Sequence, residues 1–434
     1  MTGSRSSSAA ARSSRPFAYA AFRLLFLSRG ASFLGNAIAP IALAFAVLDI
    51  TGSATDLGLV VASRTIPQVF LVLFGGVIAD RYPRTKVIVV SNSLGAISQG
   101  IAAALLIIGH ATIWQLALIQ AFNGSVTAFA FPAGAGLTPQ TIPNDVLQQA
   151  NALLRLVINA SLIGGAAIGG LLVASVGPGW AIAIDAGTFA IAAACVSRIR
   201  LQEPERPEID DAEDHPHHPK ALDETPARNS MLSDLREGWR EFITRRWLWT
   251  VVLAFSVINA AENGSLGVVG PLVADETIGR AAWGFVLSAV AVGMVLGALT
   301  ALRLRPRHTL LVGMLGIVGM LPFLLVLATH PTTPILIATA LISGLGVETF
   351  GIYWDLSMQQ HIPQQILSRV YSYDFLGSLM FIPAGQIAAG PLVAAFGTQK
   401  TLLVAAGLIA VVTAATIAVP SVRRLERTGP QRAV

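Results

Sequence analysis

The chain has 434 residues, of which 54% are hydrophobic and only 12% are charged, and its formal net charge is +5. So few charged residues exclude an ordinary soluble globular protein. The basic excess does not indicate a nucleic-acid partner, because the cations fall mainly in short stretches at the ends of long apolar runs. The sequence therefore predicts an all-α protein embedded in a lipid bilayer.

Twelve apolar runs follow one another along the chain, and each is interpreted as a membrane-spanning helix. A helix needs about 20 predominantly apolar residues to cross a bilayer, and tilt absorbs differences in length. The predicted spans are 26–48, 57–79, 87–109, 113–135, 152–174, 180–197, 247–270, 281–302, 309–329, 333–356, 370–394 and 400–419.

The distribution of charge between the ends of these spans predicts their orientation. The ends placed on the side of the N-terminus contain Arg12, Arg15, Arg23, Arg81, Arg84, Lys86, Arg198, Arg200, Arg303, Arg305, Arg307, Arg423, Arg424 and Arg427. The opposite loops contain only Arg280 and Lys400, with Asp49, Asp56, Asp275 and Glu276 beside them. By the positive-inside rule, both termini are predicted to be cytoplasmic and the chain to lie in the cell (inner) membrane.

An internal repeat divides the chain into two parts. Residues 165–177 align with 385–397 at an offset of 220, and Pro83-Arg84 aligns with Pro306-Arg307 at an offset of 223. Chance similarity between Ala/Gly-rich helices is the alternative, but two matches at nearly one offset favour a duplication. The sequence thus predicts two six-helix bundles in the same orientation, at 17–197 and 247–420.

The remaining segments are predicted to be cytoplasmic. Residues 1–16 contain no apolar core and are expected to be a disordered N-terminus without a cleavable signal peptide, and residues 421–434 form a tail. The linker 198–246 begins acidic and proline-broken. It ends in an amphipathic pattern that predicts an interfacial helix, with an apolar face formed by Leu232, Leu235, Trp239, Phe242 and Ile243.

No metal site or cofactor is predicted. Cys195 is the single cysteine, which excludes an intramolecular disulfide and a cysteine-built metal site. The cluster of His215, His217 and His218 in the linker is interpreted as solvated rather than metal-binding. The sequence contains no phosphate-binding loop, G-x-S-x-G elbow or H-E-x-x-H motif, so an ion gradient rather than ATP is the expected energy source and no enzyme activity is expected.

The turn after the second span carries a specific motif, which consists of Gly76, Asp80, Arg81, Arg84 and Lys86. It resembles the G-x-x-x-D-R-x-G-R-[R/K] signature between helices 2 and 3 of the major facilitator superfamily, with Pro83 in place of the usual glycine and Lys86 one position late. The resemblance implies twelve helices in two pseudo-symmetric six-helix bundles that rock about a midplane site.

The same resemblance implies that the acid of this turn latches the two halves together on the cytoplasmic side. Asp80 is then expected to face the beginning of span 11, where Arg369 and Asp374 lie. Because a helix start attracts a carboxylate, this arrangement is electrostatically favourable. Arg84 or Arg81 is expected to meet an acid such as Asp374 or Asp145.

Three further segments, 48–54, 147–153 and 368–370, resemble one branch of that superfamily, the macrolide-efflux and enterobactin-exporter-like drug:proton antiporters. This resemblance implies export of hydrophobic drugs or natural products in exchange for protons. Asn36 stands where many members of the branch carry Asp, so the resemblance assigns it no proton role.

Charged residues within the spans are candidates for coupling, because a charge at membrane depth costs about 2.5–3.5 kcal/mol and should face the protein interior or water. Glu348, near the middle of its span, is the first candidate for the proton carrier, followed by Glu262 and Asp185. The alternative for Glu348 is a structural pair, for instance with Arg64 across the halves. Asp185 lies about five residues into its span and is expected to be either solvated or structural.

Other residues are candidates for lining a substrate cavity. They are the charged or polar residues Asn36, Arg64, Arg155, Asn159 and Asn259, and the aromatic residues Phe350, Tyr353 and Trp354. The aromatic residues either line a pocket for an amphipathic substrate or simply pack. The paired glycines at 164–165 and 169–170 are interpreted as close helix packing rather than an antiporter motif.

The resulting functional hypothesis is a monomeric, proton-coupled exporter of hydrophobic or amphipathic small molecules that works by alternating access. One alternative is a transporter of the same fold that moves a nutrient or siderophore. Another is a membrane-embedded sensor or scaffold that does not transport. The expected partners are a small-molecule substrate, protons and the lipid bilayer.

Overall fold

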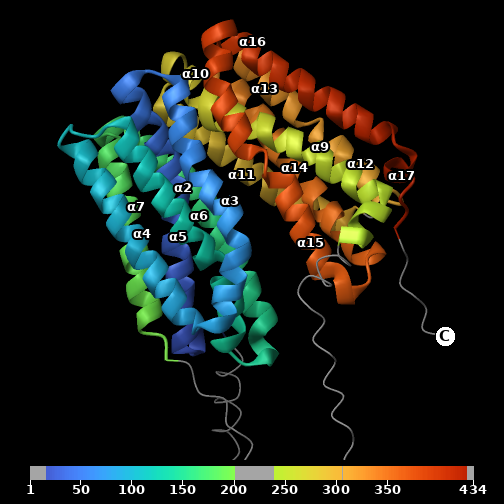
Figure 1. Cartoon of the computed structure of the whole chain (residues 1–434), viewed down its shortest axis with the longest axis horizontal. Coiled ribbons are helices and arrows are strands. Elements are labelled where there is room, and N and C mark those ends of the chain that lie inside the picture. The colour runs from blue at the N-terminus through green and yellow to red at the C-terminus, as the bar shows by residue number, and fades with distance from the viewer. Residues whose placement is uncertain (1–15, 201–238, 305, 428–434) are drawn as a thin grey trace, which may run out of the picture.

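The computed structural model describes residues 16–200, 239–304 and 306–427, and this part of the chain is helical and contains no strand (Figure 1). The first half consists of α2 (Ala20–Thr51), α3 (Ala54–Arg81), α4 (Arg84–Ile107), α5 (Ile113–Leu137), α6 (Leu147–Val176) and α7 (Pro178–Ser197). Short 3-10 turns at Pro16–Ala18, Thr138–Gln140 and Asn144–Val146 accompany them.

The second half begins with α9 (Arg246–Gly264), which continues through a π-helical turn (Ser265–Val269) into α10 (Gly270–Glu276). The helices that follow are α11 (Arg280–Arg303), α12 (Thr309–Ile317), α13 (Met320–Thr329), α14 (Thr333–His361), α15 (Gln364–Leu379), α16 (Ile382–Ala418) and α17 (Pro420–Arg423).

The helices agree with the twelve expected spans. Within the described residues, nine helical segments are long and apolar enough to cross a membrane. Helices α3 and α5, with 28 and 25 residues, are also long enough. The segment Arg369–Ala418 contains two crossings, because Gly397 leaves the helical conformation at φ 82° and ψ 165°. Arg369–Ala418 therefore covers two predicted spans, and each of the other segments covers one.

Local signals explain why the connections are so short. Gly52 ends α2 in a left-handed conformation with φ 63°, and Ser53 then caps α3 by accepting a hydrogen bond of 3.2 Å from the backbone N–H of Asp56. Thr112 and Gln115 form a capping box at the start of α5. Pro178 occupies the first turn of α7, where its missing N–H costs nothing.

The helices form two bundles that meet along two pairs of helices. Helices α2–α7 pack among themselves, as do α9–α17, while α6 packs on α11 and α3 on α16 between the halves. The ribbons of the two halves lie close together at the upper end of Figure 1, near α10, and farther apart at the lower end. We refer to these as the Asp49 end, where α2 ends, and the Arg84 end, where α4 begins.

The internal repeat is visible in these contacts. Gly170 and Gly390, which align at the offset of 220, each lie where the two halves cross most closely. A Cβ atom on Gly170 would lie 2.8 Å from the Cα atom of Gly284 in α11, and one on Gly390 would collide with the backbone of Thr55 in α3. The aligned glycines therefore occupy equivalent positions. Of the paired glycines interpreted as packing residues, Gly165, Gly169 and Gly170 are in close contact with neighbouring helices, whereas Gly164 faces open space among the described residues.

The end of the linker is helical at residues 239–244 and contacts α15. The ring of Tyr373 lies 5.5 Å from that of Trp239 and 6.0 Å from that of Phe242. Phe242 is buried, whereas Trp239 is half exposed, as expected for a helix at an interface. Leu232 and Leu235, the histidine cluster and residues 1–15 lie outside the described residues.

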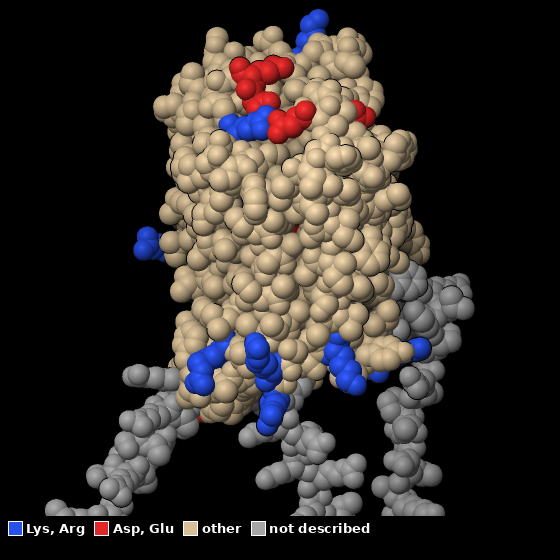
Figure 2. Space-filling model, turned by 90° about the vertical axis from the view of Figure 1, so that its left-hand side faces the viewer, with Lys and Arg blue, Asp and Glu red and all other residues tan. Residues whose placement is uncertain are grey.

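Charge is distributed unevenly between the two ends of the molecule. On the face drawn in Figure 2, the outer side of the first half, most basic side chains lie at the lower, Arg84 end. Most acidic side chains on this face lie at the upper, Asp49 end.

Candidate functional site: a polar cavity between the halves

A cavity of about 500 Å³ lies between the two halves, at mid-depth and toward the Arg84 end. The first half contributes most of its walls, and the second half contributes α9, its π-helical turn and α16. Its polar lining consists of Arg29, Ser32, Asn36, Arg64, Thr65, Gln68, Ser91, Asn92, Thr127, Asn263 and Gln386. Because a bilayer-embedded surface of this kind is unfavourable unless water or a ligand contacts it, the cavity is the leading candidate site.

Helix α2 places three of these polar residues in one row. Arg29, Ser32 and Asn36 are separated by three and four residues, so they lie on one helical face. The Asn36 side-chain amide donates to the carbonyl oxygen of Ser32 at 2.8 Å and accepts from the Arg64 guanidinium of α3 at 3.0 Å. Pro40, inside the helix, lacks the N–H that would otherwise bind the Asn36 carbonyl oxygen four residues earlier.

Asp185 lies behind this row, inside the first half. Its exposed fraction is 0%, so of the two interpretations of Asp185, solvated or structural, the structural one agrees with its burial. Gln99 of α4 donates to it at 2.9 Å, and Gln120 of α5 donates to Gln99 at 3.1 Å. Gly35 provides the space, since a Cβ atom there would collide with the carboxylate. Arg64 is the cation whose charge acts on Asp185, although the two form no direct ion pair within the described residues.

Glu262 of α9 and Glu348 of α14 belong to the second half. Neither carboxylate forms a hydrogen bond or ion pair within the part of the chain that the structure describes. Arg155 of α6 is the cation whose charge acts on Glu348. The alternative pairing of Glu348 with Arg64 is not formed, because Arg64 instead binds Asn36.

The aromatic residues of α14 pack rather than line the cavity. Phe350, Tyr353 and Trp354 are all buried, at 5%, 2% and 7% exposed. Phe350 stacks on Phe255 of α9 with ring centroids 4.0 Å apart, and Trp354 contacts Trp247 at 5.7 Å. Phe350 and Trp354 also line a separate pocket of about 190 Å³, together with Phe255 and Asp374, so a role of these aromatic residues in substrate binding stays a prediction.

The two remaining asparagine candidates also lie away from the cavity. Asn259 donates to the carbonyl oxygen of Ser378 at 2.9 Å and so ties α9 to α15. Asn159 is exposed on α6. Neither is among the described residues that line the cavity.

The turn motif is described only in part. The surroundings of Gly76 and of the Asp80 side chain are not among those described, so the contact of Asp80 with span 11 stays a prediction. Arg84 donates a hydrogen bond to the carbonyl oxygen of Gly136 in α5, and Arg81 and Lys86 are exposed. Asp374 accepts from the Trp354 indole N–H at 3.0 Å and from Ser378 at 3.1 Å. Its carboxylate is therefore bound within the second half, and Arg369 lies on the same helix, α15.

Sequence reasoning missed several residues of the cavity, notably Arg29, Gln68, Asn92, Asn263 and Gln386. Arg29 is the fourth residue of the expected span 26–48 and is not among the charged residues singled out within the spans. Since α2 begins at Ala20, Arg29 lies nearly three turns inside the helix. Its spacing from Asn36, a polar residue already singled out, was the available signal.

An ion pair joins the halves at the Asp49 end. The Arg280 guanidinium of α11 binds Asp49 of α2 through two nitrogens, at 2.5 and 3.0 Å, and also binds Asp275 at 2.7 Å. The Arg280 guanidinium carbon lies 5.0 Å from the ring centroid of Phe45, also in α2. Arg280 of the second half thus makes two contacts with α2 of the first half, to Asp49 and Phe45, while Asp275 binds the same guanidinium from within the second half.

Replacing Arg280 with Ala is expected to favour separation of the halves at this end by about 1 kcal/mol, or about fivefold in population, because the pair is partly exposed. Spin labels at Thr51→Cys and Glu276→Cys, in a Cys195→Ser background, report the distance. Lys400→Ala, which removes another cation of this end, is the control. An unchanged distance distribution at low salt contradicts a role for the pair.

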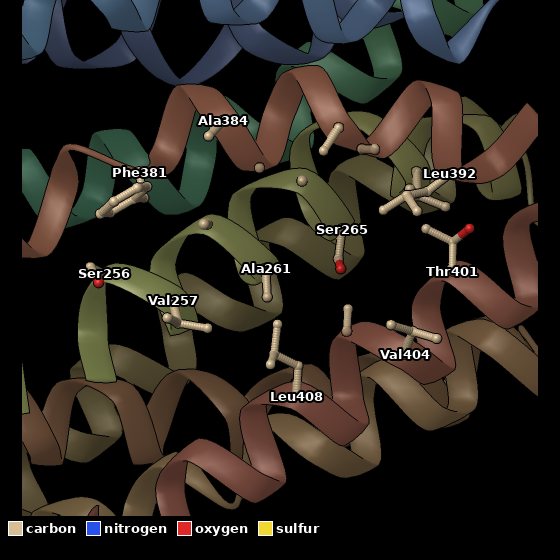
Figure 3. Close-up of a pocket in the computed structure, with 17 residues that line it drawn as sticks. Ser256, Val257, Ala261, Ser265, Phe381, Ala384, Leu392, Thr401, Val404 and Leu408 are labelled. Atoms are coloured by element: carbon tan, nitrogen blue, oxygen red, sulfur yellow. The ribbon is translucent and has the colours of Figure 1, made fainter. Parts of the chain in front are cut away.

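A second pocket, of about 300 Å³, lies within the second half between α9 and the two parts of α16 that precede and follow Gly397 (Figure 3). Its walls are formed by small and branched apolar side chains such as Ala261, Leu392, Val404 and Leu408. The polar side chains that line it are the hydroxyl residues Ser256, Ser265 and Thr401, and no charged side chain does so within the described residues. This pocket suits hydrocarbon, so the polar cavity remains the stronger candidate for a selective site.

Comparisons with known proteins agree with this architecture. The multidrug efflux pump Tap of Mycolicibacterium fortuitum is 27% identical over 387 residues, which cover 85% of this chain and 88% of the pump. The enterobactin exporter EntS of Escherichia coli O1:K1 is 25% identical over 425 residues, covering 95% of this chain and 94% of the exporter.

A solved bacterial homologue of the human lysosomal transporter Spinster, in an inward-facing and unoccupied conformation, shares the fold. Its TM-score is 0.71 at 14% identity, and the match covers 94% of this chain and 98% of the homologue. The family model of the Major Facilitator Superfamily matches residues 25–380. With its helices, its two bundles and its cavity between them, this chain belongs to the Major Facilitator Superfamily and is a multi-pass membrane transporter.

Proposed function

We propose that this transporter is a proton-coupled exporter of amphipathic small molecules that works by alternating access. The observation that carries the proposal is a polar cavity between two bundles whose ion pair and glycine crossings lie at the Asp49 end. Similarity to the pump Tap and the exporter EntS over most of the chain supports the outward direction. The protein acts as a monomer, since one chain supplies both walls of the cavity.

In the proposed orientation, both termini and the Arg84 end face the cytoplasm. The basic side chains at that end support this orientation through the positive-inside rule. A substrate then enters the cavity from the cytoplasm. Release to the outside requires the α6–α11 and α3–α16 crossings to open at the Asp49 end, together with the Arg280–Asp49 ion pair.

Proton coupling is assigned first to Glu348, with Glu262 and Asp185 as further candidates. Glu348 is half-buried without a direct partner in the described part of the chain, and Arg155 of the other half acts on its charge. Because protonation removes the attraction between Glu348 and Arg155, it weakens the link between the halves. Proton binding would thereby bias the equilibrium between the two conformations.

Substrate-driven proton movement in proteoliposomes tests the coupling. With a dansyl-labelled amphiphile as substrate and a pH dye inside, Glu348→Gln is expected to reduce coupled proton movement at least about tenfold while binding is retained. Glu276→Gln, at the Asp49 end and away from the cavity, is the matched control. Unchanged coupling in Glu348→Gln removes Glu348 from the mechanism, and Glu262→Gln is then tested in the same way.

A siderophore exporter is the second candidate function, favoured by the similarity to EntS. Expression in a siderophore-producing strain that lacks its own exporter distinguishes the two. Restored secretion of the siderophore supports this candidate, whereas resistance to unrelated amphiphiles that collapses with an uncoupler supports the broader one.

A further inference from the structure

We propose that the cavity selects amphiphiles that carry an anionic group, which binds between Arg29 and Arg64. This inference rests on the proposed export function and names the substrate class of the same site. It follows from the charges of the lining, from the unpaired state of Arg29 and from the way in which Arg64 is held.

The cavity lining carries a net positive charge. Of the described residues that line it, Arg29 and Arg64 are ionic, and none is an Asp or Glu. Asp185 lies behind the wall, and neither Glu262 nor Glu348 is among these lining residues. In a site surrounded by hydrocarbon, fixed positive charge attracts an anion and repels a cation more strongly than it would in water.

Arg29 lacks a partner in the described part of the chain. No hydrogen bond or ion pair there involves its guanidinium, which packs against Gly134 of α5. A guanidinium has five N–H donors, and a partly buried charge is costly unless it is paired. The side chain is therefore incomplete without an anion or acceptor supplied from the cavity.

Arg64 is oriented but not neutralised by direct contact. One of its nitrogens donates to Asn36 at 3.0 Å, and Asn36 is itself fixed by its bond to Ser32 at 2.8 Å. This arrangement leaves further donors of Arg64 free, while the charge of Asp185 acts from behind without an ion pair. A carboxylate entering the cavity therefore does not have to break an existing salt bridge.

The rest of the lining explains why the ligand should be amphipathic. Phe33, Leu43, Val61, Leu162 and Phe189 contribute apolar surface to the same cavity. Burial of an apolar group against these side chains provides affinity, and the arginine pair fixes the orientation of the anionic end.

Three dyes with one fluorophore and different charges test the proposal: dansylglycine (anionic), dansylamide (neutral) and dansylcadaverine (cationic). Binding to the purified full chain in detergent is followed by fluorescence. We expect dansylglycine to bind at least about tenfold more tightly than dansylcadaverine, as charge-assisted hydrogen bonds predict. Arg29→Gln should remove most of this preference, because dansylglycine loses more affinity than dansylamide does, whereas Arg29→Lys should retain it.

Arg23→Gln is the matched control, since Arg23 lies on the same helix but is exposed, and among the described residues its guanidinium binds the carbonyl oxygens of Phe17 and Ala18. Equal binding of the three dyes, preference for the cation, no binding of any dye, or an unchanged preference in Arg29→Gln would each overturn the proposal. Gel filtration of each variant confirms that it is folded.

Transport of the same dyes in proteoliposomes separates this proposal from the export function. Selective binding of dansylglycine without transport supports the anion site and counts against export. Transport of dansylcadaverine with no preference for the anionic dye supports the export function and contradicts the proposed anionic substrate class.

Discussion

A leucine at Gly170 is expected to reduce transport to less than about a tenth of the wild-type rate, because overpacking at this crossing costs typically 1–3 kcal/mol. A Cβ atom at Gly170 would lie 2.8 Å from the Cα atom of Gly284 and 2.9 Å from the carbonyl oxygen of Arg280. Both are backbone atoms of α11, so space can be made only by separating the two halves. The variant should therefore be unable to close the Asp49 end.

Gly164→Leu is the matched control on the same helix, since no heavy atom of a neighbouring helix in the described part of the chain lies within 4 Å of a Cβ atom at that position. Both substitutions improve helix propensity by a similar amount, so propensity does not account for a difference between them. Dye efflux at equal protein levels gives the transport rate, and the spin labels at residues 51 and 276 report closure. Equal activity of the two variants, whether high or low, contradicts this explanation.

Replacing Asp185 with Leu is expected to destabilise the protein by about 1–3 kcal/mol, the cost of leaving a buried polar partner unsatisfied. The Gln99 amide would lose its acceptor, and Arg64 would lose the charge that acts on it from behind. Asp185→Asn retains an acceptor oxygen for Gln99 and should cost much less. Thermal unfolding in detergent, followed by size-exclusion chromatography, measures both effects.

The same pair of variants is informative about the cavity. Because Asp185→Asn removes the negative charge behind Arg64, it should make the cavity more positive and strengthen binding of dansylglycine relative to dansylamide. Weaker binding of dansylglycine in this variant, with stability unchanged, means that Asp185 supports ligand binding otherwise than through its charge on Arg64. A stability loss in Asp185→Asn as large as in Asp185→Leu means that the charge, rather than the hydrogen bond, holds the network.

The fold was largely predictable because the bilayer imposes a length on each helix that no soluble environment would impose. Every predicted span is mainly helical, although 309–329 is divided between α12 and α13 and 370–394 between α15 and α16. Even the shortest span, 180–197, coincides with α7 (Pro178–Ser197). The duplication was detectable because glycines such as Gly170 and Gly390 are required where backbones cross. This requirement for glycine at both crossings can be recognised in a single sequence.

The site was less predictable, because its residues depend on which helices are neighbours. Asp185 lies near a helix end, but it is fully buried because Gly35 of α2 leaves room for it and Gln99 of α4 binds it. Likewise, Phe350 packs because Phe255 lies opposite it on another helix. Asn36 and Arg64 were identified as polar residues within apolar spans, but such a position contains no information on these partners.

Gly397 joins the last two crossings directly, since α16 changes direction there without a separate loop. A connection of one residue allows little relative movement of the two parts of α16, and both parts also border α9 around the apolar pocket of Figure 3. Helix α9 and the two parts of α16 should consequently move as one rigid unit when the bundles move. A fluorophore attached at Ala405→Cys, on the wall of that pocket, would keep a fixed position within this unit. The displacement of the opposite bundle can be measured relative to it.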